Sequence, residues 1–301
     1  MTAANLHSRA VDTLARLLEK HTGQQLSEAR RWRVETSLRP LLRNNALRSL
    51  DDLVSVLGRA PAGPLFDQTI DLMLNHESSF FRDLTVFQSL ETAILPEIHE
   101  RNASERRLRI WCAGCSTGKE AYSIAMALKH MGSLWDGWRI SILGTDVSPI
   151  AIEEAKRGRY AQMEMQRGLA INDLLRWFTP AGEHWQIKDE IREMVHFQTD
   201  NLLEPRAVSG EFDLILCRNV LFYFQDEKRH AAARQITRHA RNGSYLVLGA
   251  GETLVGHDTC FTPCPKHGCI YKCTDTDRCP PARGSSPQAA ERALPPNAIM
   301  R

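Results

Sequence analysis

The sequence predicts an α/β protein with a mostly parallel sheet, and three features of the chain support this fold class. Strand-like apolar runs occur at residues 108–113, 139–144, 194–198, 212–217 and 244–249. Helix-like segments follow the first, second and fourth runs, an alternation typical of a parallel sheet covered by helices on both faces. The first run ends in a turn that contains Gly114 and Gly118, after which the pattern becomes helical. Lys119 and Glu120 are expected at the mouth of this turn.

The first 75 residues predict a separate, all-helical domain. Apolar residues recur at helical spacing between residues 6 and 18, and Gly23 is a suitable helix stop. A second helix is expected from Glu28, a third after the capping residue Ser49, and a fourth after residues 61–64. The stretch 28–48 contains six arginines, at positions 30, 31, 33, 39, 43 and 48. They form either a solvated face or a docking surface for an acidic protein partner.

Composition and charge narrow the class of protein. The chain has 301 residues, a hydrophobic share of 43% and a formal net charge of +2, so its charge favours neither nucleic acid nor a membrane surface as partner. No apolar run reaches the ~18 residues that a membrane span needs. The N-terminus lacks the apolar core of a signal peptide, and the eight cysteines are expected to be reduced. We expect a cytoplasmic monomer without membrane insertion or nucleic-acid binding.

The α/β domain is expected to span residues 76–275. Between about residues 158 and 199 the strand–helix alternation is interrupted by a segment too long for a simple connection. Its aromatic residues, among them Trp177, Phe178 and Trp185, predict a small inserted subdomain rather than disorder. Residues 276–301 contain several prolines and few large apolar side chains, which predicts a disordered tail.

Polar clusters follow three of the predicted strands at their carboxyl ends, where parallel sheets bind ligands. The clusters are the glycine turn, residues 144–148 and residues 217–219. A glycine-containing turn after one strand and an acid, Asp146, at the end of the next strand are typical of a nucleoside-binding site, because a carboxylate accepts hydrogen bonds from ribose hydroxyls. The turn matches neither G-x-G-x-x-G nor G-x-x-x-x-G-K-[ST], which disfavours phosphate binding. The pattern leaves open a nicotinamide enzyme, an S-adenosylmethionine (SAM) methyltransferase, and a helix-capping role for Asp146.

Three longer blocks of sequence resemble the signatures of one known family. Residues 76–82, HESSFFR, resemble N-E-T-S-F-F-R, and residues 113–123, AGCSTGKEAYS, resemble A-G-C-S-T-G-E-E-P-Y-S. Residues 212–224, FDLILCRNVLFYF, resemble F-D-x-I-x-C-R-N-V-x-I-Y-F. Residues 200–203 and Glu252 also fall in the family's order. From about residue 5 to residue 273 the chain therefore resembles the CheR family, the chemotaxis-receptor glutamate methyltransferases.

The resemblance implies a Rossmann-like SAM-dependent methyltransferase domain, an all-helical N-terminal domain and a small inserted antiparallel β subdomain. The implied activity is transfer of the methyl group of S-adenosyl-L-methionine to glutamate side chains on the cytoplasmic helical bundle of a methyl-accepting receptor, with S-adenosyl-L-homocysteine (SAH) as product. Arg82 and Tyr223 would face the incoming glutamate as catalytic residues. The cofactor site would be lined by Gly114 and by the matching residues of the motifs: His76, Ser78, Arg82, Glu120, Asp146, Asn201, Leu202, Arg218 and Asn219.

This assignment is chemically coherent. A glutamate carboxylate, with an ordinary pKa of about 4.3, is ionised at neutral pH and needs no general base to attack a sulfonium methyl group. Catalysis is then mainly alignment and partial desolvation of the reactants. Arg82 would hold the carboxylate, Tyr223 would donate a hydrogen bond or border the sulfonium, and Glu120 would accept from the cofactor's ammonium group. The alternatives are a surface ion pair for Arg82 and an ordinary core position for Tyr223.

The sequence departs from the family pattern at several positions. His76 replaces asparagine, Ser78 replaces threonine, Lys119 replaces the first acid of the glycine turn, and Ala121 replaces proline. Residues 249–252, GAGE, replace G-H-S-E. None of these changes removes the arginine at position 82 or the acid at position 146, so cofactor binding is expected to be kept. Two other functions stay open: a non-catalytic CheR-like regulator that binds SAM, and a small-molecule SAM-dependent methyltransferase.

The C-terminal cysteines and the short segment 179–185 each bear on a separate function, metal binding and receptor tethering. Five cysteines crowd the C-terminal end, at positions 260, 264, 269, 273 and 279. Zinc binding is conceivable, but the spacing matches no common finger, and we predict no metal site. Residues 179–185 are too short for the extra glycine-containing loop with which some family members bind a receptor peptide, so this tether is not expected.

Overall fold

Five helices at the N-terminal end form a domain with its own core. The computed structural model describes residues 3–206, 208–254, 256–257, 259–274 and 298–299. The helices are α1 (Ala3–Thr22), α2 (Glu28–Arg31), α3 (Val34–Asn44), α4 (Leu50–Arg59) and α5 (Pro64–Met73). They pack around Leu14, Leu38 and Leu53, which are fully buried. Ser49 caps α4 as predicted, since its hydroxyl accepts from the Asp52 amide at 3.1 Å.

The single helix expected from residue 28 onward is wrong. α2 ends at Arg31 and α3 begins at Val34, with a turn between them. Two tertiary contacts hold the short α2 in place as a helix separate from α3. The Arg30 side chain donates to the Met73 carbonyl of α5, and Arg31 forms an ion pair with Asp12 of α1.

The rest of the chain is organised on one large mixed sheet. Its strands are β1 (Arg107–Ala113), β2 (Arg139–Asp146), β6 (Val195–Thr199), β7 (Phe212–Cys217), β8 (Ala240–Leu248), β9 (Phe261–Pro263), β10 (Ile270–Cys273) and β11 (Ala298–Ile299). Strands β6, β2, β1, β7 and β8 are parallel neighbours in that order, whereas β8, β10 and β9 pair antiparallel. The five predicted strands are confirmed. From β1 the chain first adds β2 and β6 on one side of the sheet and later adds β7 and β8 on the other side. The strand order therefore reverses between β1 and β7, which is the topological switch point of the sheet.

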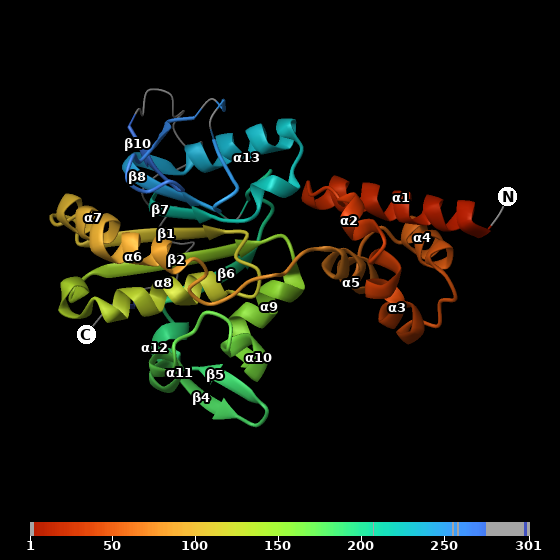
Figure 1. The fold of residues 1–301 in the computed structure, drawn as a ribbon, viewed down its shortest axis with the longest axis horizontal. Coiled ribbons are helices and arrows are strands. Elements are labelled where there is room, and N and C mark those ends of the chain that lie inside the picture. The colour runs from red at the N-terminus through yellow and green to blue at the C-terminus, as the bar shows by residue number, and fades with distance from the viewer. Residues whose placement is uncertain (1–2, 207, 255, 258, 275–297, 300–301) are drawn as a thin grey trace.

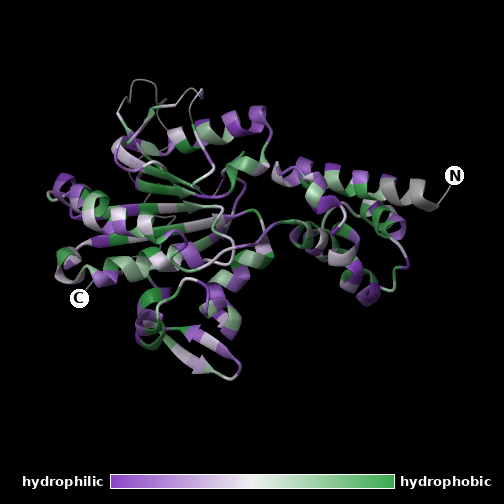
Figure 2. Cartoon of the chain, in the orientation of Figure 1, coloured by the Kyte–Doolittle hydropathy of each residue, from purple (hydrophilic) through white to green (hydrophobic). Residues whose placement is uncertain are grey.

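Both faces of the sheet are buried. On β1, the side chains of Leu108, Ile110 and Cys112 pack into one apolar cluster, and those of Trp111 and Ala113 pack into another. Helices α8 (Lys119–His130) and α9 (Pro149–Arg157) contribute to the first cluster, and α13 (Asp226–Arg238) contributes to the second. Figure 2 shows the central strands as mostly hydrophobic, as expected for a parallel sheet covered on both sides.

The remaining helices of this domain are short. They are α6 (Leu84–Ser89), the π-helix η1 (Leu90–Ile94), α7 (Leu95–Arg101), and the 3₁₀-helices η2 (Gly132–Trp135) and η3 (Leu221–Tyr223). Within the described part of the chain, no helix combines the length and the apolar character required to cross a membrane.

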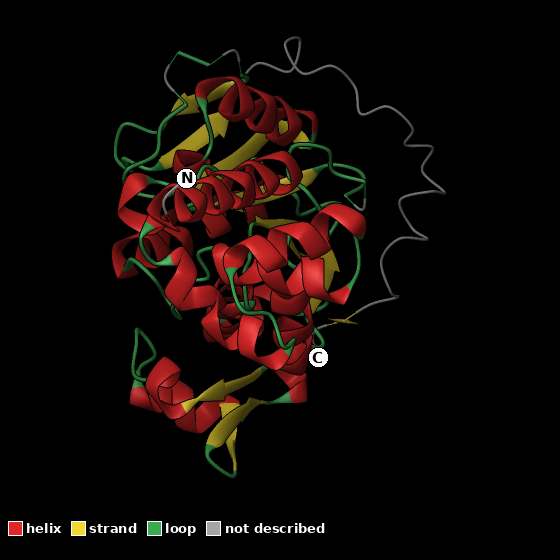
Figure 3. Ribbon diagram, turned by 90° about the vertical axis from the view of Figure 1, so that its right-hand side faces the viewer, coloured by secondary structure: helices red, strands yellow, loops and turns green. Residues whose placement is uncertain are grey.

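A second, three-stranded antiparallel sheet lies between α9 and β6, where the sequence predicts a small inserted subdomain. Its strands, in spatial order, are β3 (Arg159–Ala161), β5 (His184–Ile187) and β4 (Phe178–Ala181). The helices α10 (Gln162–Met165), α11 (Ile171–Trp177) and α12 (Asp189–Arg192) accompany it. Figure 3 shows this sheet projecting from the body of the protein. Only Gly182 and Glu183 separate β4 from β5.

We propose domain boundaries near residues 75 and 275, with the insertion at about 158–199. Most of the predicted tail, residues 276–301, lies outside the described residues. Within it, Ala298–Ile299 form β11, which pairs antiparallel with Ile140 and Arg139 of β2. These two residues are therefore part of the sheet rather than of a disordered segment.

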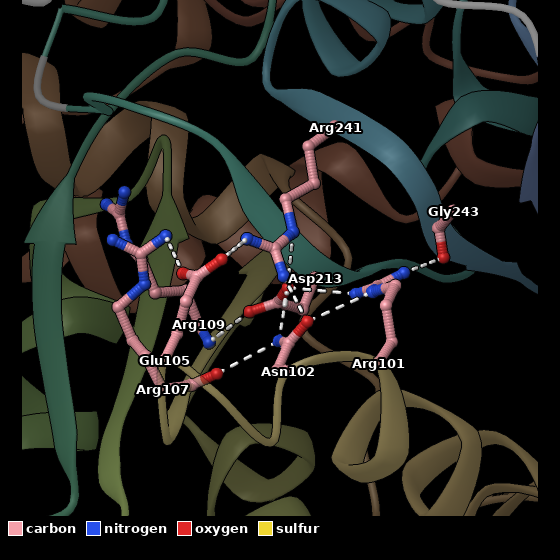
Figure 4. Close-up of polar contacts among 8 residues, drawn as sticks. All are labelled: Arg101, Asn102, Glu105, Arg107, Arg109, Asp213, Arg241 and Gly243. Carbon is pink, nitrogen blue, oxygen red and sulfur yellow. Dashed lines mark hydrogen bonds and ion pairs between the residues drawn. The ribbon is translucent and has the colours of Figure 1, made fainter.

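Four polar groups from three segments converge on the carboxylate of Asp213 (Figure 4). Asp213 is 1% exposed and lies near the start of β7. Its Oδ1 accepts from Arg101 at 2.9 Å, from Asn102 at 2.9 Å and from Arg241 at 2.7 Å. Its Oδ2 accepts from the backbone amide of Arg109 at 2.8 Å. This network ties the end of α7 to the amino-terminal edge of the sheet, where β1, β7 and β8 begin.

Candidate active site

A pocket lies at the carboxyl ends of the central strands, and residues of the helical domain contribute to its wall. Figure 1 shows these strand ends facing the helical domain. Its volume, open mouth included, is about 910 Å³. The walls come from the loops after β1, β2, β6 and β7, from the segment 74–79, and from Thr22 and Gln24 of the helical domain. The pocket thus lies at the switch point of the sheet, where ligands of open α/β folds bind.

The structure brings every predicted site residue into this one pocket. They come from separate stretches of the chain: His76, Ser78, Arg82, Gly114, Glu120, Asp146, Asn201, Leu202, Arg218, Asn219 and Tyr223. The parallel sheet explains this convergence, because its strands deliver their following loops to the same edge.

In the glycine turn after β1, the position of Gly114 leaves no room for a side chain. Gly114 has φ 74°, and a Cβ added there would lie 2.4 Å from Cγ2 of Val220. The amides of Gly114 and Cys115 both donate to the Thr145 carbonyl of β2, at 2.8 and 2.9 Å. The positive φ and the close approach of the neighbouring loop both require glycine here.

Asp146 organises the loops at the end of β2. Its Oδ2 accepts from the Ser116 amide at 2.8 Å, and its Oδ1 accepts from the Ser148 amide at 3.0 Å. The residue that caps α9 is Ser148, whose hydroxyl accepts from the Ala151 amide at 3.0 Å, so the helix-capping alternative for Asp146 is wrong. Burial raises the pKa of Asp146 above its ordinary value, although the two amide hydrogen bonds partly offset this effect.

His76, which replaces the family's asparagine, forms a polar bridge beside Asp146. Its Nε2 lies 3.0 Å from Oδ1 of Asp71 in α5, and the hydroxyl of Ser148 donates to the same carboxylate. Burial alone would lower the pKa of His76, but the hydrogen bond and the charge of Asp71 raise it above its ordinary value. The bridge joins the helical domain to the start of α9.

Arg218 lies between two carboxylates at the other end of the pocket. Its side chain is 1% exposed, and its Nη1 lies 2.9 Å from Oε2 of Glu120. Its Nη2 pairs with Asp83 and donates to the Arg82 carbonyl at 3.0 Å. Burial raises the pKa of Glu120, and the positive charge of Arg218 opposes this rise.

Arg82 and Tyr223 both face the pocket. Arg82 donates to the Glu77 carbonyl at 3.3 Å and forms no ion pair with any residue that the structure describes, so the surface ion pair is wrong. Tyr223 is half-buried rather than in the core, and its hydroxyl accepts a hydrogen bond from Asn75. The guanidinium carbon of Arg30 lies 5.7 Å from the centroid of the Tyr223 ring.

Glu252 supports the site from outside the pocket wall, a role that the sequence did not reveal. It is 8% exposed, and its Oε1 accepts from the amides of Leu221 and Phe222 at 2.7 and 3.3 Å. Its Oε2 accepts from the amides of Asn219 and Gly249, both at 2.7 Å. One carboxylate thus shapes the loop that presents the pocket residues after β7. Its place in the family order was the only signal in the sequence.

Two expectations about charged residues need correction. Lys119 does not lie at the mouth of the turn: it is 4% exposed, and its Nζ lies 2.7 Å from Oε1 of Glu164 in the inserted subdomain. Of the six arginines, Arg30 and Arg31 make contacts within the helical domain and do not belong to a free basic face. The other four are exposed: Arg33, Arg39, Arg43 and Arg48.

The cysteines of the described C-terminal region pack at the edge of the sheet. The sulfur atoms of Cys260 and Cys273 lie 2.9 Å apart between β9 and β10, and both residues are buried. Cys279 lies outside the described residues. Among the residues that the structure covers, no cluster of three or more His, Cys, Asp or Glu side chains has the arrangement of a metal site.

The fold and the pocket are those of a Rossmann-like enzyme that binds a nucleoside, and comparison with known proteins identifies the class as a SAM-dependent methyltransferase. A model of the CheR methyltransferase SAM-binding domain matches residues 76–269. The chain is 37% identical over 245 residues to the chemotaxis protein methyltransferase Cher2 of Pseudomonas putida, covering 79% of this chain and 88% of that protein. It is 33% identical over 259 residues to the chemotaxis protein methyltransferase of Vibrio parahaemolyticus, covering 85% of this chain and 93% of that protein. The chain belongs to the CheR family of methyltransferases.

The pocket residues suit SAM, the cofactor of this family. The pocket wall contains the carboxylates of Glu120 and Asp146 and apolar surface from Val147 and Leu202, a set of groups that fits the ammonium, hydroxyl and base parts of SAM. In the wall of the pocket, Oε1 of Gln24 is buried without a hydrogen-bond partner among the described residues. A buried polar atom of this kind is expected to be satisfied by a ligand or by water.

Proposed function

We propose that the enzyme methylates glutamate side chains on the cytoplasmic helical bundle of a methyl-accepting chemotaxis receptor and produces glutamate methyl esters. The observation that supports this substrate most directly is the placement of Arg82 and Tyr223 on the wall of the SAM pocket. Arg82 has no ion-pair partner among the described residues, so its guanidinium is available to a carboxylate. The relatives named chemotaxis protein methyltransferases support the same pathway.

We assign the cofactor contacts from the chemistry of the pocket residues. Glu120 would accept from the ammonium group of the methionine part, held in orientation by Arg218. Asp146 would accept from the ribose hydroxyls, with its position set by the amides of Ser116 and Ser148. His76, Ser78, Gly114, Asn201, Leu202 and Asn219 would complete the walls of the site.

Methyl transfer to a carboxylate requires alignment more than acid–base chemistry. SAM supplies an electrophilic methyl group on a sulfonium. A glutamate side chain is ionised at neutral pH and can attack without losing a proton first. Arg82 would orient its carboxylate by charge-assisted hydrogen bonds, and Tyr223 would border the reacting groups. Enclosure of both reactants in the pocket would favour the reaction by proximity and by exclusion of water.

We propose further that the exposed arginines at positions 33, 39, 43 and 48 form the docking surface for the receptor. Positive charge on this face would attract an acidic helical surface and increase the association rate. Trp32 is 67% exposed, and the guanidinium carbon of Arg33 lies 5.0 Å from the centroid of its ring, so the face also offers an aromatic contact. The enzyme would act as a monomer in the cytoplasm.

Methyl transfer to purified receptor fragments tests the substrate assignment. The full chain is incubated with SAM labelled in the methyl group and with cytoplasmic fragments of candidate receptors. We expect label that is released by mild base, as methyl esters are, and that is lost when the modified glutamates are replaced by alanine. Tight binding of SAH without transfer to any fragment would favour a regulator. Transfer to small molecules alone would favour a small-molecule enzyme.

A further inference from the structure

Lys119 and Glu164 join the glycine turn of the pocket to the inserted subdomain. Lys119 is the first residue of α8, Glu164 lies in α10, and their Nζ and Oε1 atoms are 2.7 Å apart. The side chain of Lys119 is only 5% exposed. Its Nζ also donates to Oγ1 of Thr117 at 2.9 Å and lies 5.2 Å from the centroid of the Tyr160 ring. These partners belong to the turn and to the insertion, and the lysine side chain points away from the SAM pocket.

A lysine at this position is unfavourable by itself. The N-terminal end of a helix has a partial positive charge, which destabilises a cation there, and burial adds a desolvation cost. Glu164 offsets both effects. Burial alone would raise the pKa of Glu164, but the hydrogen bond and the charge of Lys119 hold it below its ordinary value. Each charge of the pair is therefore stabilised by the other.

The same side of the insertion packs on the loop that contains Arg82. The hydroxyl of Tyr160 donates to the Thr117 carbonyl at 2.8 Å, and its ring contacts that of Phe80 edge to face at 5.1 Å. A Cβ added to Gly168 would lie 1.9 Å from the Phe80 carbonyl oxygen, so the two backbones are in close approach. The insertion thus touches both the glycine turn and the loop at 76–82.

A hydrogen-bonded path continues from Lys119 to the same loop. The hydroxyl of Ser123 donates to the Lys119 carbonyl at 2.7 Å and accepts from the Phe81 amide at 2.9 Å. Phe81 immediately precedes Arg82 in the chain, and Lys119 immediately precedes Glu120. A shift of Lys119 would therefore displace two residues of the pocket wall.

We propose that the Lys119–Glu164 ion pair is a positioning element of the active site. It clamps the inserted subdomain onto the N-terminal end of α8 and thereby holds Glu120 and Arg82 in place. None of the described residues of the insertion lines the pocket, so the insertion can act on cofactor binding only indirectly, through its contacts with the glycine turn and with the loop at 76–82. The proposal concerns the cofactor side of the site and does not depend on the identity of the methyl acceptor.

Titration of the full chain with SAH, well below its unfolding temperature, tests this role. Glu164→Gln is expected to weaken SAH binding on the order of tenfold, because a displaced Glu120 would lose part of its charge-assisted hydrogen bond to the ammonium group of the ligand. The matched control is Glu153→Gln, which removes an exposed Lys–Glu pair of similar length, Lys156–Glu153 at 2.8 Å, and should leave the affinity unchanged. Charge reversal supplies a rescue: Glu164→Lys alone should bind poorly, and Lys119→Glu combined with Glu164→Lys should restore most of the affinity.

Two results would overturn the proposal. The first is a Glu164→Gln protein that binds SAH like the wild type while only its unfolding temperature falls. The second is a charge-reversed pair that binds no better than Glu164→Lys alone. If Glu164→Gln does not fold, the double variant Lys119→Met, Glu164→Gln leaves no buried charge and permits the same comparison. A tenfold loss of SAH affinity in that protein supports the positioning role, and unchanged affinity contradicts it.

Discussion

Nη1 of Arg218 lies 2.9 Å from Oε2 of Glu120, across the floor of the SAM pocket. The two residues are 98 positions apart: Arg218 directly follows β7, and Glu120 lies in the first turn of α8, the helix after β1. Arg218 thus fixes the orientation of the carboxylate that we assign to the ammonium group of the cofactor. The positive charge of Arg218 also favours the ionised form of Glu120, which burial disfavours.

Glu120→Gln is expected to weaken SAH binding by about tenfold to a hundredfold. The change removes a charged hydrogen-bond acceptor from the site, and hydrogen bonds to charged groups contribute about 1.5–3 kcal/mol. Isothermal titration calorimetry measures the effect. Glu227→Gln, on the exposed first turn of α13, is the control and should bind as the wild type does. Equal affinities for the wild type and Glu120→Gln would contradict the assignment.

The pH dependence of SAH affinity should also report on Glu120. Its pKa is raised above the ordinary value of 4.5, and the ammonium group requires the ionised carboxylate. As pH falls through this raised pKa, Glu120 takes up a proton and the affinity of the wild type should decline. In Glu120→Gln this decline should be absent or smaller. If the affinities of the two proteins for SAH changed in parallel between pH 4.5 and 8, Glu120 would not be the group responsible for the decline.

Arg82→Lys should reduce the rate of methyl transfer by on the order of 100-fold or more. Lysine keeps the charge but cannot hold a carboxylate through two parallel hydrogen bonds, so alignment of the acceptor is lost. The affinity for SAH should change much less than the rate, which separates the acceptor side from the cofactor side. Single-turnover transfer to a receptor fragment gives the rate, with Arg206→Lys, an exposed arginine, as control. A loss confined to SAH binding would place Arg82 with the cofactor alone.

His76 should make the stability of the protein depend on pH. The pKa of His76 is raised above 6.5 in the folded protein because of Asp71, although burial opposes the rise. A raised folded-state pKa means that the stabilisation is present below about pH 6.5 and is lost as pH rises through the folded value. The wild type should therefore exceed His76→Asn in free energy of unfolding by more at pH 6 than at pH 8.5. Urea denaturation at both values measures this difference, and a constant difference would refute the prediction.

Asp213→Asn should destabilise the fold by about 3–5 kcal/mol, because Arg101 and Arg241 would then retain charges without their buried carboxylate. The network in Figure 4 lies at the amino-terminal edge of the sheet, so SAH binding by the folded protein should persist. Glu105→Gln is a matched control. Its carboxylate is half-exposed, and its loss should cost less than about 1 kcal/mol. Chemical denaturation of both variants measures their free energies of unfolding, and equal losses in the two would contradict the prediction.

Much of the architecture was predictable because it follows from local pattern. The five parallel strands are near-continuous apolar runs, as both faces of the sheet are covered. Gly114 and Asp146 were recognisable because a turn and an acid at strand ends have a fixed place in this topology. The motif resemblance added the other site residues, and the structure places all of them in one pocket.

The sequence by itself determined the fold class and the parallel sheet, and its short motifs predicted which side chains meet at the carboxyl edge of that sheet, since each of these depends on periodicity or on a short motif. Only the tertiary structure decided the partners of individual charges. It placed Lys119 against Glu164 in the insertion, joined Arg30 to the carbonyl of Met73, and gave Glu252 its four amide donors. Such pairs are formed between segments far apart in the chain, and their energies depend on burial and distance. A linear sequence contains neither quantity, so these contacts had to be observed.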